Sequence, residues 1–225
     1  MWCVPELNRE YVERMENVLD LLARPLNPRE PVLALDERPV QLLDSLRVGR
    51  TAKPGCVARR DYEYRRCGTA NVFCIVEPLA GRHFTHATRN RKRGAFARAL
   101  ARIERAYPDA RKIHLIVDNL NTHSERSLVL TFGELEGRRL WRRFAVTYTP
   151  KHGSWLNPAE IEVSLWSREC LGKRRVPYLV QLKHFTALWN RDADRRRRKI
   201  SWSFKSADAR SLFRYQVFTT PRSKH

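Results

Sequence analysis

Two short apolar segments of this chain each end close to a carboxylate, and they restrict the fold more than any other feature. Residues 31–37 read PVLALDE and carry Asp36, and residues 112–119 read KIHLIVDN and carry Asp118. Apolar segments of this length are typical of strands buried inside a sheet. A membrane-spanning helix needs about 20 apolar residues. We therefore expect an α/β protein and no membrane span.

Helical and strand patterns alternate along the rest of the chain. Apolar residues at helical spacing predict helices over residues 8–24, 93–107, 124–132, 157–171 and 178–195. Further strands are predicted over residues 61–66, 71–77, 82–85 and 144–149, with a turn at 67–70 and a loop at 49–60. Successive strands followed by strand–helix units predict one mixed sheet with helices on both faces. The length of 225 residues suits one large domain, alone or with a small appendage.

The chain combines a large excess of positive charge with a high apolar content. Lys and Arg number 44 against 24 Asp and Glu, the formal charge is +20, and 42% of the residues are hydrophobic. The apolar content excludes a disordered basic tail. The charge indicates a polyanionic partner, most often nucleic acid.

The cysteines and the first residues indicate the compartment. The five cysteines include no CxxC pair, so neither a zinc finger nor a disulfide framework is expected. The first ten residues lack the basic and apolar regions of a signal peptide. We expect a cytoplasmic protein with reduced thiols.

Three carboxylates are candidates for one site. Asp36 and Asp118 follow apolar strands, and sites in open α/β sheets form beyond the carboxyl ends of strands. Glu160 is the third, because Asn157 and the proline after it are typical of a helix start. Each acid alone is also explained as a turn former, a helix cap or compensation of the helix dipole. Glu162, two positions further on, cannot face the same site as Glu160.

Converging carboxylates in a strongly basic protein indicate a site for divalent cations. Oxygen ligands select Mg²⁺ or Mn²⁺ over zinc. Two such ions, about 4 Å apart, would activate water or a 3′-hydroxyl for attack on phosphorus. A glycosidase-type acid pair is the alternative, but it leaves the charge of +20 without a role.

Two longer motifs carry a resemblance to a known family. DNLNTH at residues 118–123 and YTPKHGSWLNPAE at residues 148–160 resemble the second and third motif blocks of bacterial insertion-sequence transposases, in the IS six-thirty branch of the Tc/mariner superfamily. LDE at residues 35–37 resembles the first block. The similarity extends over nearly the whole chain.

The resemblance implies an RNase H-like fold, a mixed sheet flanked by helices, with a DDE triad that falls on Asp36, Asp118 and Glu160. These residues are then the catalytic residues and the ligands of two Mg²⁺ or Mn²⁺ ions. The implied reaction is nicking of DNA at transposon ends by water, followed by transfer of the freed 3′-hydroxyl to target DNA. No covalent protein–DNA intermediate is expected.

The resemblance also predicts the organisation of the chain. Residues 1–28 are interpreted as an N-terminal helical linker, and residues 29–225 as the catalytic domain. The helix-turn-helix region of the family is expected to be absent from this chain. A separate chain is the alternative that would supply it. DNA is the expected partner, a homodimer is expected in the synaptic complex, and the location is a bacterial cytoplasm, in association with the nucleoid.

Other side chains receive functional interpretations with simpler alternatives. Contacts to DNA are predicted for Lys151, His152, Arg142, Arg143, Arg196 and Arg197, and a solvated basic surface is the alternative for each. His123 is interpreted as structural and Trp166 as part of the core. Two other functions stay open: a non-catalytic DNA-binding remnant of a transposase, and an RNase H-like nuclease or resolvase.

Overall fold

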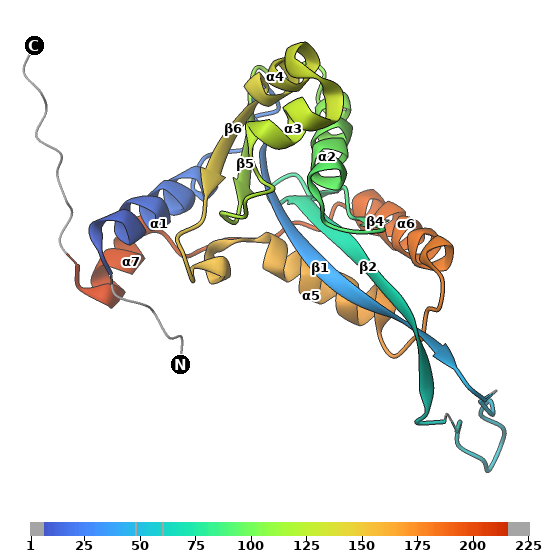
Figure 1. Ribbon diagram of the computed structural model, residues 1–225. Helices are drawn as coiled ribbons and strands as arrows, with labels where there is room; N and C mark the ends of the chain where they lie inside the picture. The colour runs from blue at the N-terminus through green and yellow to red at the C-terminus, as the bar shows by residue number, and fades with distance from the viewer. Residues whose placement is uncertain (1–6, 48, 60, 216–225) are drawn as a thin grey trace, which may run out of the picture.

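One mixed sheet of six strands organises the chain, in the order β3-β2-β1-β5-β6, with β4 also paired to β2 (Figure 1). The computed structural model describes residues 7–47, 49–59 and 61–215, so the first six residues of the predicted linker lie outside the described residues. The strands are β1 (Val32–Ser45), β2 (Tyr64–Glu77), β3 (Arg82–His83), β4 (His86–Thr88), β5 (Ile113–Val117) and β6 (Phe144–Tyr148). The helices are α1 (Arg9–Leu22), α2 (Arg93–Ala106), α3 (Glu125–Phe132), α4 (Glu134–Arg142), α5 (Ala159–Trp166), α6 (Leu179–Arg195) and α7 (Ser206–Phe213).

Alternating side chains of the central strands build a core on each face of the sheet. Leu33 and Leu35 of β1 pack with Phe96 and Leu100 of α2, in a cluster that α3 and α4 complete. On the opposite face, Ala34 packs in a cluster with α1, α7 and the start of α5. A third cluster joins the far halves of β1 and β2 to α5 and α6. The predicted α/β sheet with helices on both faces is thereby confirmed.

β2 differs from its prediction. The two strands expected over residues 61–66 and 71–77 are one continuous strand, antiparallel to β1 along its length. Gly68, with φ +111°, lies beside a shift in register between Leu42 and Leu43 of β1. A glycine at positive φ is typical of a turn, but it also suits a β-bulge inside a strand. β1 likewise continues past Glu37 to Ser45, so the two strands form a long arm (Figure 1).

Two helices were not predicted. In α4 only Gly137 and Leu140 are buried, and five of its nine residues are charged. A Cβ at Gly137 would lie 2.6 Å from the backbone of Val129, so α3 and α4 pack together only because this residue is glycine. α7 is similarly short, with Ser206 and Ala209 buried. Trp166 is fully buried, as expected. No helix among the described residues is both long enough and apolar enough to span a membrane.

Candidate active site

Parallel pairing of β1 and β5 brings Asp36 and Asp118 to the same place along the sheet. Ala34 of β1 is in register with Ile116 of β5, and each aspartate follows two residues later. β5 ends at Val117, whereas β1 continues, paired only with β2. Asp36 is therefore a residue within a strand, next to the position where the neighbouring strand has ended.

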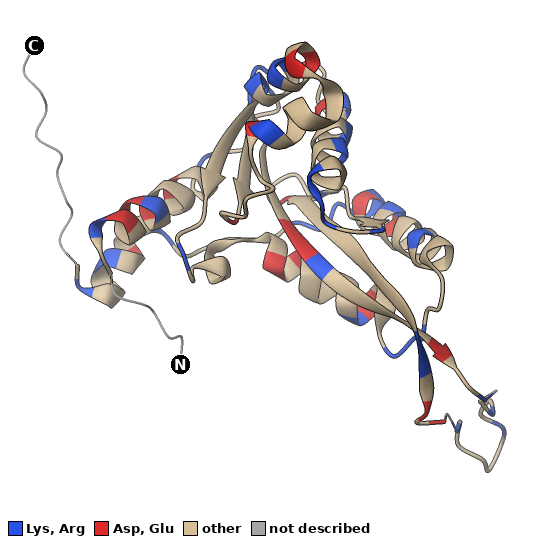
Figure 2. Cartoon of the chain, viewed as in Figure 1, with Lys and Arg blue, Asp and Glu red and all other residues tan. Residues whose placement is uncertain are grey.

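Glu160 is joined to this place through Asn157. The buried Asn157 side chain donates from Nδ2 to the carbonyl oxygen of Leu35 at 2.9 Å, and its Oδ1 accepts from the Ala159 amide at 3.1 Å. One amide side chain therefore connects the residue before Asp36 to the first turn of α5. Figure 2 shows the acidic positions of β1 and of the start of α5 close together.

The pKa of Asp36 shows that the three acids interact. Burial raises this pKa to about 7, and the charges of Glu160, Glu37 and Asp118 act in the same direction. The Glu37 amide, which donates to Asp36 Oδ1 at 2.7 Å, opposes the shift. The structure thus places both Asp118 and Glu160 within electrostatic reach of Asp36.

These carboxylates fit a divalent cation. Among the described residues, no Lys or Arg forms an ion pair with Asp36, Asp118 or Glu160, although the chain carries 44 such cations. Acids that repel one another stay ionised when a cation lies between them. Oxygen-only ligands are those that Mg²⁺ and Mn²⁺ prefer.

His123 forms a bridge between two acids. Its Nε2 lies 2.7 Å from Glu37 Oε1, and its Nδ1 lies 2.7 Å from Asp118 Oδ1 and 3.1 Å from the Asp118 carbonyl oxygen. Burial disfavours the charged ring, but hydrogen bonds to Asp118 and Glu37 outweigh it and raise the pKa of His123 to about 10. The ring also packs 4.5 Å from Phe96 between centroids.

The bridge orients Asp118 and is not itself a metal site. Glu37, Asp118 and His123 place ligand atoms within 4.8 Å of one another. The imidazole, however, lies between the acids, is closed to solvent and uses both nitrogens. A doubly protonated ring in this position fixes one oxygen of Asp118, whose side chain is still 38% exposed, and leaves the other oxygen available.

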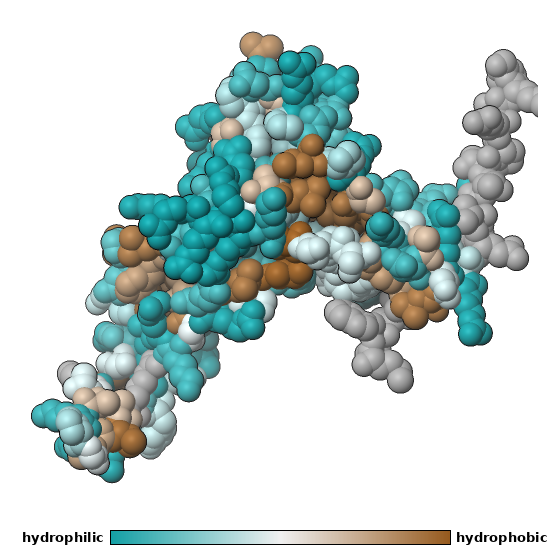
Figure 3. Space-filling view, turned by 180° about the vertical axis from the view of Figure 1, so that it is seen from behind, coloured by the Kyte–Doolittle hydropathy of each residue, from teal (hydrophilic) through white to brown (hydrophobic). Residues whose placement is uncertain are grey.

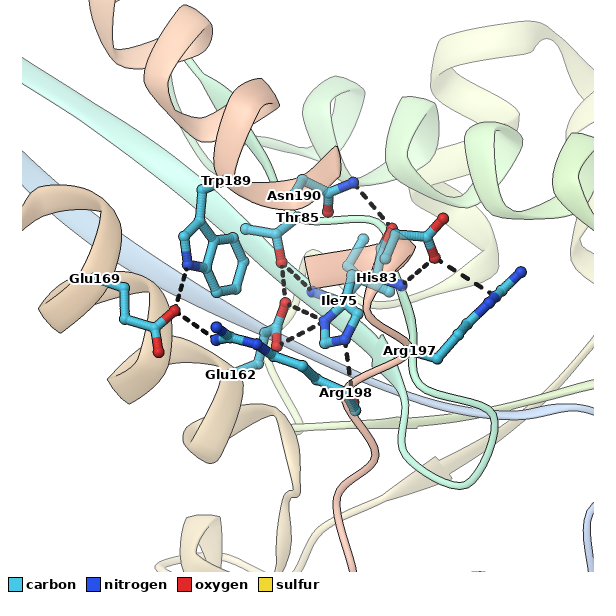
Figure 4. Close-up of polar contacts among 10 residues, drawn as sticks. Ile75, His83, Thr85, Glu162, Glu169, Trp189, Asn190, Arg197 and Arg198 are labelled. Atoms are coloured by element: carbon cyan, nitrogen blue, oxygen red, sulfur yellow. Dashed lines mark hydrogen bonds and ion pairs between the residues drawn. The ribbon is translucent and has the colours of Figure 1, made fainter. Parts of the chain in front are cut away.

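Glu162 anchors α5 to the sheet. It lies two positions after Glu160 and, as expected from this spacing, faces a different side of the helix. Its side chain is fully buried, and both carboxylate oxygens lie 3.0 Å from His83 Nδ1 (Figure 4). Thr85 Oγ1 donates to Glu162 Oε1 at 2.7 Å, and His83 Nε2 faces the carbonyl oxygen of Arg198 at 3.1 Å. These contacts join α5 to β3, to the segment before β4 and to the chain after α6.

A cleft of about 750 Å³ opens beside Asp118. Its lining includes Lys151 and His152, two of the six predicted DNA contacts, and Arg14 of α1. Lys151 and His152 are exposed, and no Lys151 ion pair is present within the described ranges. The loop after β6 therefore brings positive charge to the wall of the carboxylate site.

The other four predicted DNA contacts lie away from this cleft. Arg142 and Arg143 precede β6, whereas Asp118 lies beyond the carboxyl end of the parallel strand β5. Arg143 donates to the carbonyl oxygens of Ala110 and Tyr107. Arg196 and Arg197 follow α6 and form ion pairs with Asp192 and Asp194 at 3.0 and 3.7 Å.

Glu37 and His123 were not predicted as site residues. Their contact joins positions 86 residues apart in the sequence. It depends on the register of β1 with β5 and on the turn after β5. The sequence contains one indication of this contact: a histidine, His123, lies five residues after the candidate aspartate Asp118.

A mixed RNase H-like sheet with one carboxylate on β1, one directly after β5 and one in the first turn of α5 is typical of metal-dependent nucleases and strand transferases. The chain belongs to the DDE superfamily endonucleases, whose family model matches residues 31–183. The resemblance in the motifs is thus confirmed, and enzymes of this family use divalent metal ions. No curated protein matches the chain significantly.

Solved structures of a mariner transposase share the fold. The Mos1 mariner paired end complex with Mn has a TM-score of 0.55 at 17% identity, covering 88% of this chain and 60% of that chain. The Mos1 strand transfer complex has a TM-score of 0.54 at 17% identity, covering 85% and 57%. The chain therefore spans about 60% of the length of these structures. The predicted RNase H-like fold is confirmed.

Proposed function

We propose that this chain is the catalytic domain of a DDE transposase, which cuts DNA at transposon ends and joins the freed 3′-hydroxyl to target DNA. The observation that carries the proposal is the grouping of Asp36, Asp118 and Glu160 without a Lys or Arg partner among the described residues. The family match supports it. So does the similarity in fold to Mos1 structures, one a paired end complex and the other a strand transfer complex.

The three acids would hold two Mg²⁺ or Mn²⁺ ions. Such ions supply a deprotonated attacking oxygen and stabilise the leaving oxygen of the phosphodiester. Asp118 presents one oxygen because His123 holds the other. Asn157 fixes the position of Glu160 relative to β1, because its side-chain amide donates to the carbonyl oxygen of Leu35, the residue before Asp36. These partners of Asp118 and Glu160 would orient the carboxylates towards the ions.

Basic residues would provide the contacts to DNA. Lys151 and His152 would contact the backbone of the strand that lies in the cleft, beside Asp118. Arg142, Arg143, Arg196 and Arg197 would contact DNA only where a duplex extends beyond the cleft, and Arg196 and Arg197 would first exchange their aspartate partners. Such contacts favour DNA of any sequence.

The assembly and location belong to the same proposal. Residues 1–28 would be an N-terminal helical segment, whose helix α1 packs on the sheet of the catalytic domain, residues 29–225, and a separate chain would supply a helix-turn-helix region. Two copies would meet as a homodimer in a synaptic complex. The setting would be the nucleoid in a bacterial cytoplasm.

Incubation of the purified chain with supercoiled plasmid in Mg²⁺ or Mn²⁺ tests the proposal. We expect nicked circles that require the metal, disappear with EDTA and disappear in Asp118→Ala. Asp109→Ala, which removes an exposed acid from the loop before β5, serves as the matched control and should nick normally. Joining of a labelled 3′-end to plasmid distinguishes a transposase from a nuclease or resolvase of the same fold.

Other outcomes would overturn parts of the proposal. Plasmid binding with no cleavage in either metal would favour the non-catalytic DNA-binding remnant. Cleavage that persists in Asp118→Ala would exclude the carboxylate site itself.

A further inference from the structure

A second concave surface lies on the β4 side of the sheet, between α2 and α6. It encloses about 480 Å³ and is lined by Arg102 of α2 and by Lys183 and Arg191 of α6. We call these three residues, with the hollow they line, the basic groove. It shares no lining residue with the cleft beside Asp118.

The helices present these cations because their other faces are buried. In α2, Arg98, Arg102 and Arg105 are exposed and recur about once per turn, while Phe96 and Leu100 pack in the core. In α6, Lys183 and Arg191 are exposed, two turns apart, while Leu182 is buried. Figure 2 shows the blue positions of α2 and α6 near one another, and the view from behind shows hydrophilic side chains gathered there (Figure 3).

The charge of the basic groove is not neutralised within the protein. Among the described residues, none of its three cations forms an ion pair with an acid, unlike Arg138, Arg139 and Arg111 on other surfaces. The pKa of Arg102 is lowered by burial and by the neighbouring Arg105, with no acid acting in the opposite direction.

Asp194 is the acid in the lining of the groove, and it has partners of its own. Its Oδ1 accepts from the His83 amide at 3.1 Å, and it pairs with Arg197 at 3.7 Å (Figure 4). Neither contact involves the three cations. Positive charge concentrated in a concave surface, whose one lining acid is engaged with His83 and Arg197, matches a chain of phosphates.

We propose that the basic groove binds the sugar–phosphate backbone of duplex DNA, at a place separate from the carboxylate cleft. The inference rests on the proposed function, because it takes DNA as the substrate. It extends that function by giving the domain a second, sequence-independent hold on the duplex. Two contact regions on one domain would keep a nicked duplex bound while its end moves in the cleft.

The salt dependence of DNA binding tests this proposal without cleavage. Affinity of the full chain for a random-sequence duplex is measured in EDTA over a range of salt concentrations. Each phosphate contact contributes about 0.9 to the slope of log affinity against log salt. We expect the triple variant Arg102→Gln, Lys183→Gln, Arg191→Gln to lose roughly 2 to 3 from the magnitude of that slope.

Two further variants separate a local contact from a general loss of charge. Arg111→Gln, Arg138→Gln, Arg139→Gln removes the same net charge from ion-paired surface positions, and its slope should fall by less than about 1. Arg102→Lys with Arg191→Lys keeps the charge and should keep the slope. Circular dichroism and a melting curve check that each variant is folded.

The outcomes also separate this inference from the proposed function. Equal slopes for the two triple variants, with DNA still bound and plasmid still nicked, would overturn the basic groove alone. Absence of duplex binding by the unmodified chain would overturn the groove and the proposed function together.

Discussion

At the scale of single residues, Asp118 is oriented by an imidazole that a second acid holds in place. His123 lies between Glu37 and Asp118 at 2.7 Å from each, with its side chain closed to solvent. Partners of metal ligands fix ligand orientation, and losing one typically weakens metal binding 10- to 100-fold. Glu37 and His123 are therefore positioning residues.

We predict that Glu37→Gln weakens Mn²⁺ binding by roughly tenfold while the protein stays folded. The amide retains the shape of the side chain but removes the charge that holds His123. Titration of Mn²⁺ followed by electron paramagnetic resonance measures the affinity. Glu63→Gln, on a partly exposed glutamate near Asp61, is the matched control. Equal affinity in the two variants would contradict a positioning role for Glu37.

His86 gives the fold a dependence on pH. Burial is the main cause that lowers the pKa of His86 to about 4, while its ring stacks on Phe73. The unfolded chain takes up a proton near pH 6.5, and the folded protein does so only near pH 4. The contribution of His86 to the free energy of unfolding is therefore complete above pH 6.5, and it is lost as the pH falls from there towards 4.

We predict that His86→Phe loses less stability on acidification than the unmodified chain, by about 1 to 2 kcal/mol between about pH 7 and about pH 5. Urea unfolding at the two pH values measures the free energy of unfolding, and comparing the variants removes contributions from other groups. The same pH dependence in both proteins would show that His86 is not the cause.

The residue scale also shows what the sequence could and could not reveal about the site. Asp36, Asp118 and Glu160 were predicted because strand ends and helix starts leave local patterns. The Glu37–His123 contact leaves none, since it depends on strands that lie far apart in the chain. Arg142 and Arg143 were predicted from local charge, which carries no information on which end of β6 they occupy.

At the scale of elements, α5 carries two glutamates with opposite roles. Glu160 is exposed and lies among acids that repel it, whereas Glu162 is buried against His83 and Thr85. Two positions along a helix place side chains on different faces. Glu160 is exposed beside Asp36, whereas Glu162 fixes the helix to the sheet.

We predict opposite effects for the two substitutions. Glu162→Ala leaves His83 buried without its acid and should cost about 3 to 5 kcal/mol of unfolding free energy. Glu160→Ala relieves repulsion at an exposed position, so stability should stay within about 0.5 kcal/mol or rise, while nicking is lost. Urea denaturation and the plasmid assay measure both. A large loss of stability in Glu160→Ala would show that the residue is structural.

Strands and helices could be predicted where buried apolar residues recur at a regular spacing. The strands around Leu33 and Leu115 and the helix around Leu100 were predicted for that reason. β2 was divided in the prediction, because only its pairing with β1 shows that Gly68 lies in a bulge. α4 was missed because five of its nine residues are charged and only Gly137 and Leu140 are buried.

At the scale of the whole molecule, the charge of +20 is arranged around a small acidic centre. Basic residues line the cleft beside Asp118 and the separate basic groove, while Asp36, Asp118 and Glu160 have no Lys or Arg partner among the described residues. A polyanion is attracted to the molecule as a whole, but only a divalent cation allows its phosphates to approach these carboxylates. The proposed function therefore depends on the claim that these carboxylates bind a divalent metal ion.

Anomalous diffraction from crystals grown with Mn²⁺ tests that claim most directly. We predict a peak with oxygen ligands from Asp36, Asp118 and Glu160 at roughly 2.0 to 2.2 Å, and His123 still hydrogen-bonded to Glu37. A peak bound by Glu37 and His123 instead, or no peak near Asp36 at saturating Mn²⁺, would contradict the account.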